Sequence, residues 1–87
     1  MITIDIAKDF STMPGGRYMS EGPYSGEEFR IKFLRPKYLE AKSKNQKLRV
    51  ILDGCFGYPS SFLDESFGQL AREFNNPNIL DDIEIIS

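Results

Sequence analysis

Two adjacent serines, Ser60 and Ser61, stand where a turn passes into an amphipathic helix, in the stretch GYPSSFLDESFG of residues 57–68. A serine at a helix start does one of two kinds of chemistry. Its oxygen accepts a hydrogen bond from a free helix amide, or a kinase transfers a phosphate to it. Ser61 and Asp64 have the spacing of a capping box. The spacing therefore predicts that Ser61 caps a helix whose first residue is Phe62, with Ser60 as the alternative cap.

The place of this helix start in the chain favours a binding site. It follows a strand that we expect to be central, and ligands of open α/β sheets bind at the carboxyl ends of such strands. The free amides of a helix N-terminus attract phosphate. A phosphoserine here would meet these amides but would also face Asp64 and Glu65, and this repulsion suits a reversible switch. The same amides alternatively predict a small anion- or nucleotide-binding domain.

The composition excludes most catalytic chemistry. The 87 residues include no histidine and one cysteine, so Ser-His-Asp catalysis, Cys-His catalysis and zinc-site spacing are ruled out. We therefore expect no catalytic residue, no metal, no cofactor and no enzyme activity. The net charge of −2 gives no sign of a nucleic-acid protein. The basic run KSKNQK of residues 42–47 contains no aromatic residue for base stacking, which is typical of a solvated loop.

Length and hydropathy indicate a single small domain. A chain of 87 residues is long enough for one domain, residues 1–87, and too short for two. No apolar run approaches the roughly 20 residues of a membrane helix. The chain enters the stretch ITIDI without the basic flank and apolar run of a signal peptide. A single cysteine makes no internal disulfide, which favours a cytoplasmic location.

Hydrophobic periodicity predicts three strands and leaves room for a fourth. Residues 1–6 alternate apolar and polar side chains, and residues 83–87 end the chain in the same way. Residues 48–54 contain an unbroken apolar run, which predicts a central strand covered on both faces. Residues 17–22, after a Pro-Gly-Gly break, are a candidate short strand folded back on the first. Polar residues on the outer strands indicate a partly open sheet face or exposed edges: Thr3, Asp5 and Glu84.

Two helices separate these strands. Ser25 and Glu28 form a capping box that begins the first helix. Pro36 predicts either a kink in this first helix near Arg35 or its division into two short helices, of which the later one ends by about Lys44. The second helix carries an apolar stripe at spacings of four, three and four: Leu63, Phe67, Leu70 and Phe74. The alternation predicts an α/β domain with a mixed or mostly parallel sheet of three to four strands and two crossover helices, in the order β-(β)-α-β-α-β.

Two blocks of sequence carry a resemblance to a known family: RYMSEGPYSGEEF, residues 17–29, and SSFLDESFG, residues 60–68. Over about residues 9–70 the chain resembles the STAS-like domain of unknown function, a small prokaryotic family related to the STAS domains of anti-sigma-factor antagonists and sulphate transporters. The resemblance implies a STAS-like fold. It also implies a non-enzymatic regulatory or adaptor module that binds a histidine-kinase-like ATPase through the N-terminus of the second helix.

The resemblance further implies serine phosphorylation, because STAS domains carry an Asp-Ser-Ser-Gly-like motif that such a kinase phosphorylates. Two alignments of that motif are open. If Asp64 matches its aspartate, Glu65 occupies the place of the serine, Ser66 is the next residue, and the charge is permanent. If the motif lies at the helix start, the phosphorylated residue is Ser60 or Ser61. The candidate switch residues are therefore Ser60, Ser61 and Ser66.

The remaining candidates lie in the two turns. Arg17, the only basic residue in the loop before the first helix, pairs either with a phosphate or with Asp64, and we favour the internal ion pair. Three tyrosines predict either an aromatic partner surface or cover for the ends of a small core. The candidate partner- or anion-binding residues are Arg17, Tyr18, Tyr24, Ser25, Tyr58, Asp64 and Glu65. The alternative function is a switch-free interaction or inhibitor protein, for example one encoded by a phage or mobile element.

Overall fold

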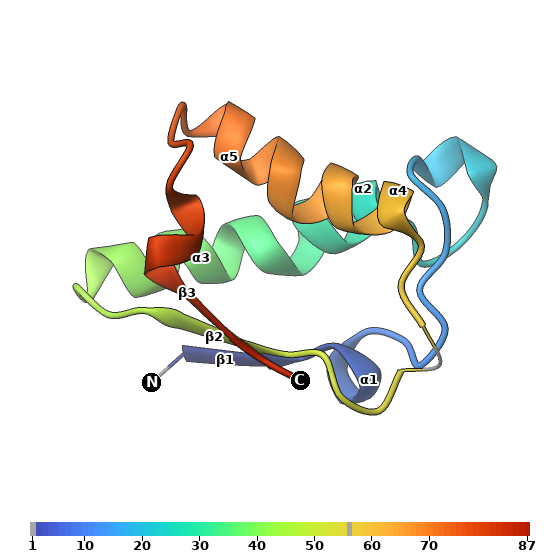
Figure 1. Ribbon diagram of the computed structural model, residues 1–87, viewed down its shortest axis with the longest axis horizontal. Coiled ribbons are helices and arrows are strands. Elements are labelled where there is room, and N and C mark those ends of the chain that lie inside the picture. The colour runs from blue at the N-terminus through green and yellow to red at the C-terminus, as the bar shows by residue number, and fades with distance from the viewer. Residues whose placement is uncertain (1, 56) are drawn as a thin grey trace.

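A three-stranded parallel sheet forms one layer of the protein in the computed structural model, which describes residues 2–55 and 57–87 (Figure 1). All three predicted strands are confirmed, and the middle one in the chain is central in the sheet. Met1 and Phe56, which belong to the predicted first strand and to the turn after the second, lie outside the described residues. The strands lie in this order: β1 (Ile2–Asp5), β2 (Leu48–Ile51) and β3 (Ile83–Ile86).

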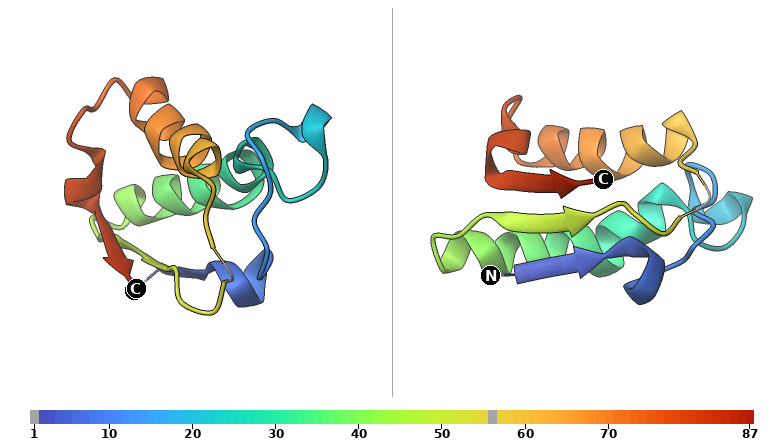
Figure 2. Two further views of the ribbon diagram at one scale, coloured as in Figure 1. Left: turned by 45° about the vertical axis from the view of Figure 1, so that its right-hand side comes forward. Right: turned by 60° about the horizontal axis from the view of Figure 1, so that its bottom comes forward.

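Two long helices, each built from three consecutive segments, lie on one side of the sheet (Figures 1 and 2). Both connections step in the same direction along the sheet, and right-handed crossovers in one direction place both helices on the same side. The first long helix consists of α2 (Gly26–Phe29), a π-helical segment (Arg30–Leu34) and α3 (Arg35–Ser43). The second long helix consists of α4 (Ser60–Leu63), a π-helical segment (Asp64–Gly68) and α5 (Gln69–Glu73). The short elements are α1 (Ile6–Asp9) and 3₁₀ turns at Met19–Glu21 and Ile79–Asp82.

The core lies between the sheet and the two long helices. Leu48 and Val50 of the central strand point into it and are fully buried. Phe29 and Phe62, one from each long helix, are also fully buried, with ring centroids 5.7 Å apart. Each such side chain contributes roughly 1.5–3 kcal/mol by leaving water. The other buried apolar residues are Ile4, Ile6, Leu34, Tyr38, Ala41, Leu70, Ile79 and Ile83.

The prediction that both faces of β2 are covered is wrong. Arg49 and Ile51 are only half-buried, because both long helices lie on the opposite face. Thr3, Arg49 and Glu84 are side by side in register across the three strands, and Arg49 Nε lies 3.3 Å from the Glu84 carboxylate. The open sheet face indicated by the polar residues of the outer strands is therefore confirmed.

Residues 17–22 do not form the candidate fourth strand. They contain the 3₁₀ turn instead, and the Glu21 carboxylate accepts hydrogen bonds from the amides of Arg17 and Tyr18 at 3.0 and 2.8 Å. These bonds close the loop on itself and use amides that a strand would need for pairing. Within the described part of the chain the sheet thus has three strands, all parallel.

Pro36 does not divide the first long helix. The Arg35 amide bonds to the Arg30 carbonyl, five residues back, so a wide π-helical turn comes immediately before the proline. Pro36 has no amide hydrogen to donate and its ring needs space on the preceding turn, and a wider turn accommodates both. The helix then continues to Ser43 with Lys44 as its C-cap, which confirms the predicted end.

The apolar stripe predicted for the second long helix is only partly correct. Leu70 is fully buried, but Leu63 and Phe67 are partly buried and Phe74 is 36% exposed. Phe62 and Ser66 are fully buried instead. The π-helical segment adds a residue to one turn, and each added residue rotates the remainder of the helix by about 100° around the axis. A stripe drawn with a uniform 3.6-residue period cannot include that rotation.

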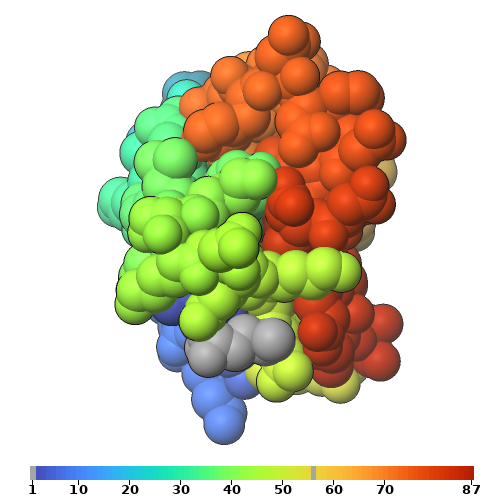
Figure 3. Space-filling view, turned by 90° about the vertical axis from the view of Figure 1, so that its left-hand side faces the viewer, coloured from blue at the N-terminus to red at the C-terminus, as the bar shows by residue number. Residues whose placement is uncertain are grey.

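One end of the molecule joins the end of the first long helix to the segment before β3. Figure 3 shows the green residues of α3 beside the red residues of Ile79–Asp82. The Asp82 carboxylate accepts hydrogen bonds from the Tyr38 hydroxyl at 2.9 Å and from Lys42 Nζ at 3.4 Å. Tyr38 also packs on Phe74, with ring centroids 5.1 Å apart. These contacts position the start of β3.

Candidate functional site

The two long helices touch backbone to backbone where the first one begins. A Cβ at Gly26 would lie 2.6 Å from the Phe62 carbonyl oxygen and 3.1 Å from Glu65 Cβ, so only glycine fits. Close packing of this kind brings the two π-helical segments together, and π-helical turns occur frequently at functional sites. Gly26 was not among the residues predicted from the sequence. Its signal is a glycine in the first turn of a helix, where it costs about 1 kcal/mol relative to alanine.

A buried ion pair lies between the π-helical segments. Arg30 Nη2 is 3.0 Å from Glu65 Oε2, Arg30 Nε donates to the Glu65 carbonyl at 3.0 Å, and both side chains are only 8% exposed. Arg30 Nη1 also donates to Glu73, whose other oxygen lies 2.7 Å from Arg35 Nη2. The charge of Glu65 is therefore paired inside the protein. It does not form the exposed permanent charge that one alignment of the motif implied.

Arg17 pairs with Asp64, as its charge and loop position favoured. Arg17 Nη1 lies 2.5 Å from Asp64 Oδ2 and 3.6 Å from Glu65 Oε1. The hydrogen bond from Arg17 holds the pKa of Asp64 below its usual value, and Arg72, with Nη2 3.6 Å from Asp64, acts in the same direction. The same bond raises the pKa of Arg17. This pair fastens the loop before the first long helix to the second long helix.

The loop itself is held by backbone bonds and by acidic side chains. The amides of Gly26 and Glu27 bond to the carbonyls of Gly16 and Arg17 at 2.8 and 3.0 Å. The Glu27 carboxylate accepts from the Met19 amide at 2.8 Å. Carboxylates thus satisfy amides that a loop without secondary structure would leave to water. The loop is consequently an ordered wall next to the start of the second long helix.

The structure confirms the cap at Ser25 and overturns the one at Ser61. The Glu28 amide donates to Ser25 Oγ at 3.0 Å, and the Glu28 carboxylate accepts from the Tyr24 amide at 2.9 Å, one residue before the cap. Ser25 is fully buried, so a binding partner does not reach its hydroxyl on this surface. The internal cap is the role that the structure shows for Ser25.

The second long helix begins at Ser60, two residues before the predicted start at Phe62, with Pro59 as the N-cap and no side-chain cap. The amides of Phe62 and Leu63 bond to the Pro59 carbonyl at 3.0 and 3.2 Å, so backbone bonds replace the one expected from Ser61. Proline supplies a fixed φ that favours this entry. Ser60 is exposed and Ser61 is half-buried, both in the first helical turn.

Ser66 lies in the helix interior, unlike the other two candidate switch residues. Its side chain is fully buried, and Ser66 Oγ donates to the Phe62 carbonyl at 2.8 Å. A kinase reaches this hydroxyl only if the helix opens. Ser60 and Ser61 are therefore the candidates whose positions are compatible with phosphorylation of the folded chain.

The three tyrosines do not form one surface cluster. Tyr18 and Tyr24 are 47% and 44% exposed, and Tyr24 packs edge to face on Phe10 at 5.4 Å. Tyr58 is half-buried, and its hydroxyl donates to the Leu52 carbonyl at 2.7 Å. Burial raises the pKa of Tyr58. Tyr58 thus covers one end of the core, which is one of the two roles predicted for the tyrosines. Tyr18 remains exposed.

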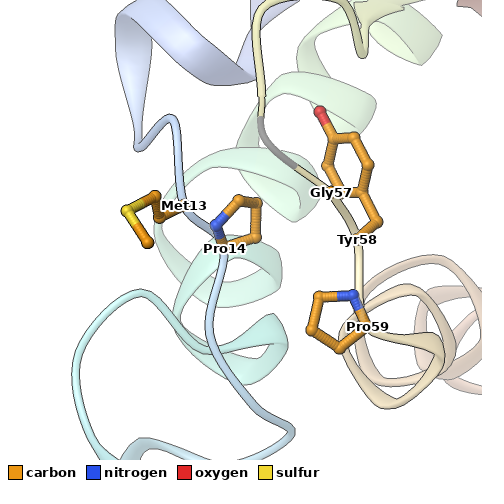
Figure 4. Close-up of a pocket in the computed structure, with 5 residues that line it drawn as sticks. All are labelled: Met13, Pro14, Gly57, Tyr58 and Pro59. Atoms are coloured by element: carbon orange, nitrogen blue, oxygen red, sulfur yellow. The ribbon is translucent and has the colours of Figure 1, made fainter.

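A pocket of about 400 Å³ lies beside the start of the second long helix. Figure 4 shows Met13 and Pro14 on one side and Gly57, Tyr58 and Pro59 on the other. Met13 is 68% exposed at the rim. The sequence indicated the Pro-Gly-Gly segment only as a break and did not predict this wall. A methionine next to that break was the available signal.

The loop and the helix start form one continuous candidate surface, which we call the helix-start surface. Its members are Met13, Pro14, Arg17, Pro59, Ser60, Ser61 and Asp64. It combines hydroxyls, an exposed carboxylate–guanidinium pair and a pocket lined by Met13, Pro14, Gly57, Tyr58 and Pro59. Among the described residues, no group of three or more Cys, Asp or Glu side chains is arranged to hold a metal ion. No helix in residues 2–55 or 57–87 combines the length and the apolar character that crossing a membrane requires.

Comparison with protein families matches residues 25–87 to the STAS-like domain of unknown function (DUF4325). The match includes both long helices, β2 and β3, and it covers Ser60, Ser61 and Asp64 of the helix-start surface. No curated protein and no solved structure matches the chain.

Proposed function

Because the chain belongs to the family of STAS-like domains of unknown function, we propose that it is a regulatory module that binds a protein partner through the helix-start surface. The observation that carries the proposal is the fastening of the loop to the second long helix by Arg17 and Asp64. A loop held in this way offers a partner a preformed surface, which reduces the entropy lost on binding. The pocket between Pro14 and Pro59 receives an apolar side chain of the partner.

The partner in this proposal is a histidine-kinase-like ATPase that also phosphorylates Ser60 or Ser61. The exposed hydroxyl of Ser60, in a first turn without a side-chain cap, supports phosphorylation at the helix start. A phosphate there adds a charge of about −1.5 to −2 within one turn of Asp64. Arg17, which already pairs with Asp64, is the cation that would take up this charge. The modification would therefore loosen the loop and change the surface that the partner recognises.

A switch-free docking protein is the second candidate function. The alignment that puts Glu65 in the place of the motif serine favours it, because the next serine, Ser66, is fully buried and leaves that alignment no accessible residue to phosphorylate. In that function the same surface binds its partner without modification. Phosphorylation and binding must therefore be measured separately.

Phosphorylation is tested by incubating the chain with a purified histidine-kinase-like ATPase and ATP, followed by intact mass measurement. The proposal expects the mass of one phosphoryl group on the wild type and none on the Ser60→Ala/Ser61→Ala variant. Ser20→Ala, which alters an exposed serine outside the helix-start surface, is the matched control and should be modified normally. Modification that persists in the double variant would contradict the assignment.

Binding is tested by calorimetry with the same ATPase and no ATP. Met13→Asp should weaken binding at least about tenfold, because a charge at the pocket rim opposes apolar docking. Leu39→Asp alters another exposed apolar residue, 48% exposed on α3, and should leave binding unchanged. Binding without modification would select the switch-free function, and equal affinity of wild type and Met13→Asp would refute the helix-start surface.

A further inference from the structure

The outer edge of β3 presents backbone groups that no other strand uses. The Leu52 amide donates to the Ile86 carbonyl at 2.7 Å, and Ile86 is in register with Ile51. In a parallel ladder, both backbone groups of one residue point to the same neighbouring strand, and those of the next residue point away. Ile86 and Glu84 therefore face β2. The amides and carbonyls of Ile83 and Ile85 point out of the sheet.

No described segment covers this edge. β3 is the last strand in the sheet, as the right-hand view of Figure 2 shows, and its residues form the lower right border of Figure 3. Within residues 2–55 and 57–87, no hydrogen bond from another segment reaches the outward groups of Ile85 or the carbonyl of Ile83, whereas the Ile83 amide already bonds to the Leu80 carbonyl in the preceding 3₁₀ turn. The Ile85 side chain is 38% exposed although it lies on the helix-covered face in register with Val50. An apolar open edge of this kind is a template for pairing with another strand.

The opposite edge of the sheet, formed by β1, differs both in its free backbone groups and in its charge. The same register places the backbone groups of Thr3 and Asp5 on the outside of β1. The outward amide of Asp5 is already taken, because it donates to Asp9 Oδ2 at 2.9 Å. The two carboxylates also put negative charge at this edge, which is a common means of preventing strand addition. β1 is thus protected and β3 is not.

We propose that β3 is the pairing surface for a second copy of this chain, which adds edge to edge and antiparallel about a two-fold axis at Ile85. In this register each Ile85 forms a hydrogen-bonded pair with the Ile85 of the other copy. Ile83 lies opposite Ser87 of the other copy and uses only its outward carbonyl, which accepts from the Ser87 amide, because the Ile83 amide is bonded to Leu80. The two three-stranded sheets become one sheet of six strands.

The charge pattern of β3 selects this register. Centring on Ile85 places Glu84 opposite Ile86 of the other copy, so the two glutamates do not meet. Centring on Glu84 would oppose two like charges, which destabilises a strand pair. A strand that adds to this edge should be apolar on the helix-covered face and carry one charge on the open face. β3 itself has this pattern. The inference does not depend on the helix-start surface.

Charge-swap variants at Ile85 test the proposal, because the register places this residue against its own copy. The wild type should be a dimer by analytical ultracentrifugation, and Ile85→Glu and Ile85→Lys should each be monomers through like-charge repulsion. An equimolar mixture of the two variants should recover dimers through opposite charges. Ile31→Glu is the matched control, since Ile31 is 37% exposed on the first long helix, and it should remain a dimer.

Hydrogen exchange on the wild type gives a test that needs no variant. The Ile85 amide should be protected at high protein concentration and exchange at least about tenfold faster on dilution, while the Val50 amide in the central strand should not respond. A wild type that stays monomeric, variants that stay dimeric, or a mixture that recovers no dimer would each overturn the proposal. Circular dichroism of the variants establishes that they are folded before their mass is interpreted.

Discussion

Removal of one partner from the buried ion pair should destabilise the protein strongly. At 3.0 Å and an effective dielectric constant of about 20, two unit charges attract by roughly 5–6 kcal/mol. Taking Arg30 and Glu65 out of water costs several kcal/mol for each ion, so the intact pair contributes little net stability. When Arg30 is lost, however, Glu65 stays buried with Arg17 at 3.6 Å as its remaining cation. We expect Arg30→Met to cost about 3–5 kcal/mol.

That loss is large for a domain of this size. A chain of 87 residues has a total unfolding free energy of roughly 4–13 kcal/mol. The variant should therefore melt more than about 12 °C lower than the wild type. Glu73 keeps Arg35 at 2.7 Å and does not add a second unpaired charge. The effect is consequently assigned mainly to the bonds of Arg30 with the Glu65 carboxylate and carbonyl.

Urea unfolding of two single variants and their double variant is the assay. Arg30→Met and Glu65→Met should each be costly, and the double variant should lose at least about 2 kcal/mol less than their sum, because no buried charge is left unpaired. Lys32→Met removes an exposed pair with Glu28 and should cost under about 0.5 kcal/mol. Single variants that cost under about 1 kcal/mol, or a double variant equal to the sum, would refute the reasoning.

Three further predictions concern the helix contact, the loop and the caps. Gly26→Ala should cost about 1–3 kcal/mol in urea unfolding, because its Cβ would meet the neighbouring helix backbone at 2.6 Å; a neutral effect would show that the helices separate freely. Arg17 lowers the pKa of Asp64 in the folded state, so this carboxyl stabilises the fold above its unfolded pKa of about 4 and loses that contribution as the pH falls through the folded pKa. In Arg17→Gln, an NMR titration should show the pKa of Asp64 rising toward its ordinary value, and an unchanged pKa would contradict the pairing. Ser25→Ala should cost about 1 kcal/mol and Ser61→Ala under about 0.5 kcal/mol, because only Ser25 caps a helix; equal losses in calorimetric melting would argue against this difference.

The local patterns of the sequence predicted the elements well and their junctions less well. The Ser25 cap, the three strands and the end of the first long helix at Lys44 follow from side-chain types within a few residues. The start at Ser60 was missed because a backbone carbonyl, that of Pro59, replaces the expected side-chain cap. Capping patterns in a sequence predict side-chain bonds only, so a cap made by a backbone carbonyl leaves no such pattern.

Part of the candidate site was likewise predictable from the sequence, and part was not. The family resemblance identified the helix start, and the Arg17–Asp64 pair was available from charge and loop position. Spacing could not distinguish Ser60 from Ser66, because the difference between them is burial. Arg30 lies 35 positions from Glu65 and gave no local signal.

The sequence by itself determined the order of strands and helices, the capped start of the first long helix and the absence of histidine chemistry, because these depend on residue types and short spacings. Only the tertiary structure decided which face of the sheet is open, which serines are accessible and where Glu65 places its charge. The open face results from the position of both long helices on one side of the sheet, and the burial of Ser66 and Glu65 results from the close contact of those helices at Gly26. This contact joins π-helical segments far apart in the chain, and these segments rotate the buried faces away from the positions that a regular helix predicts.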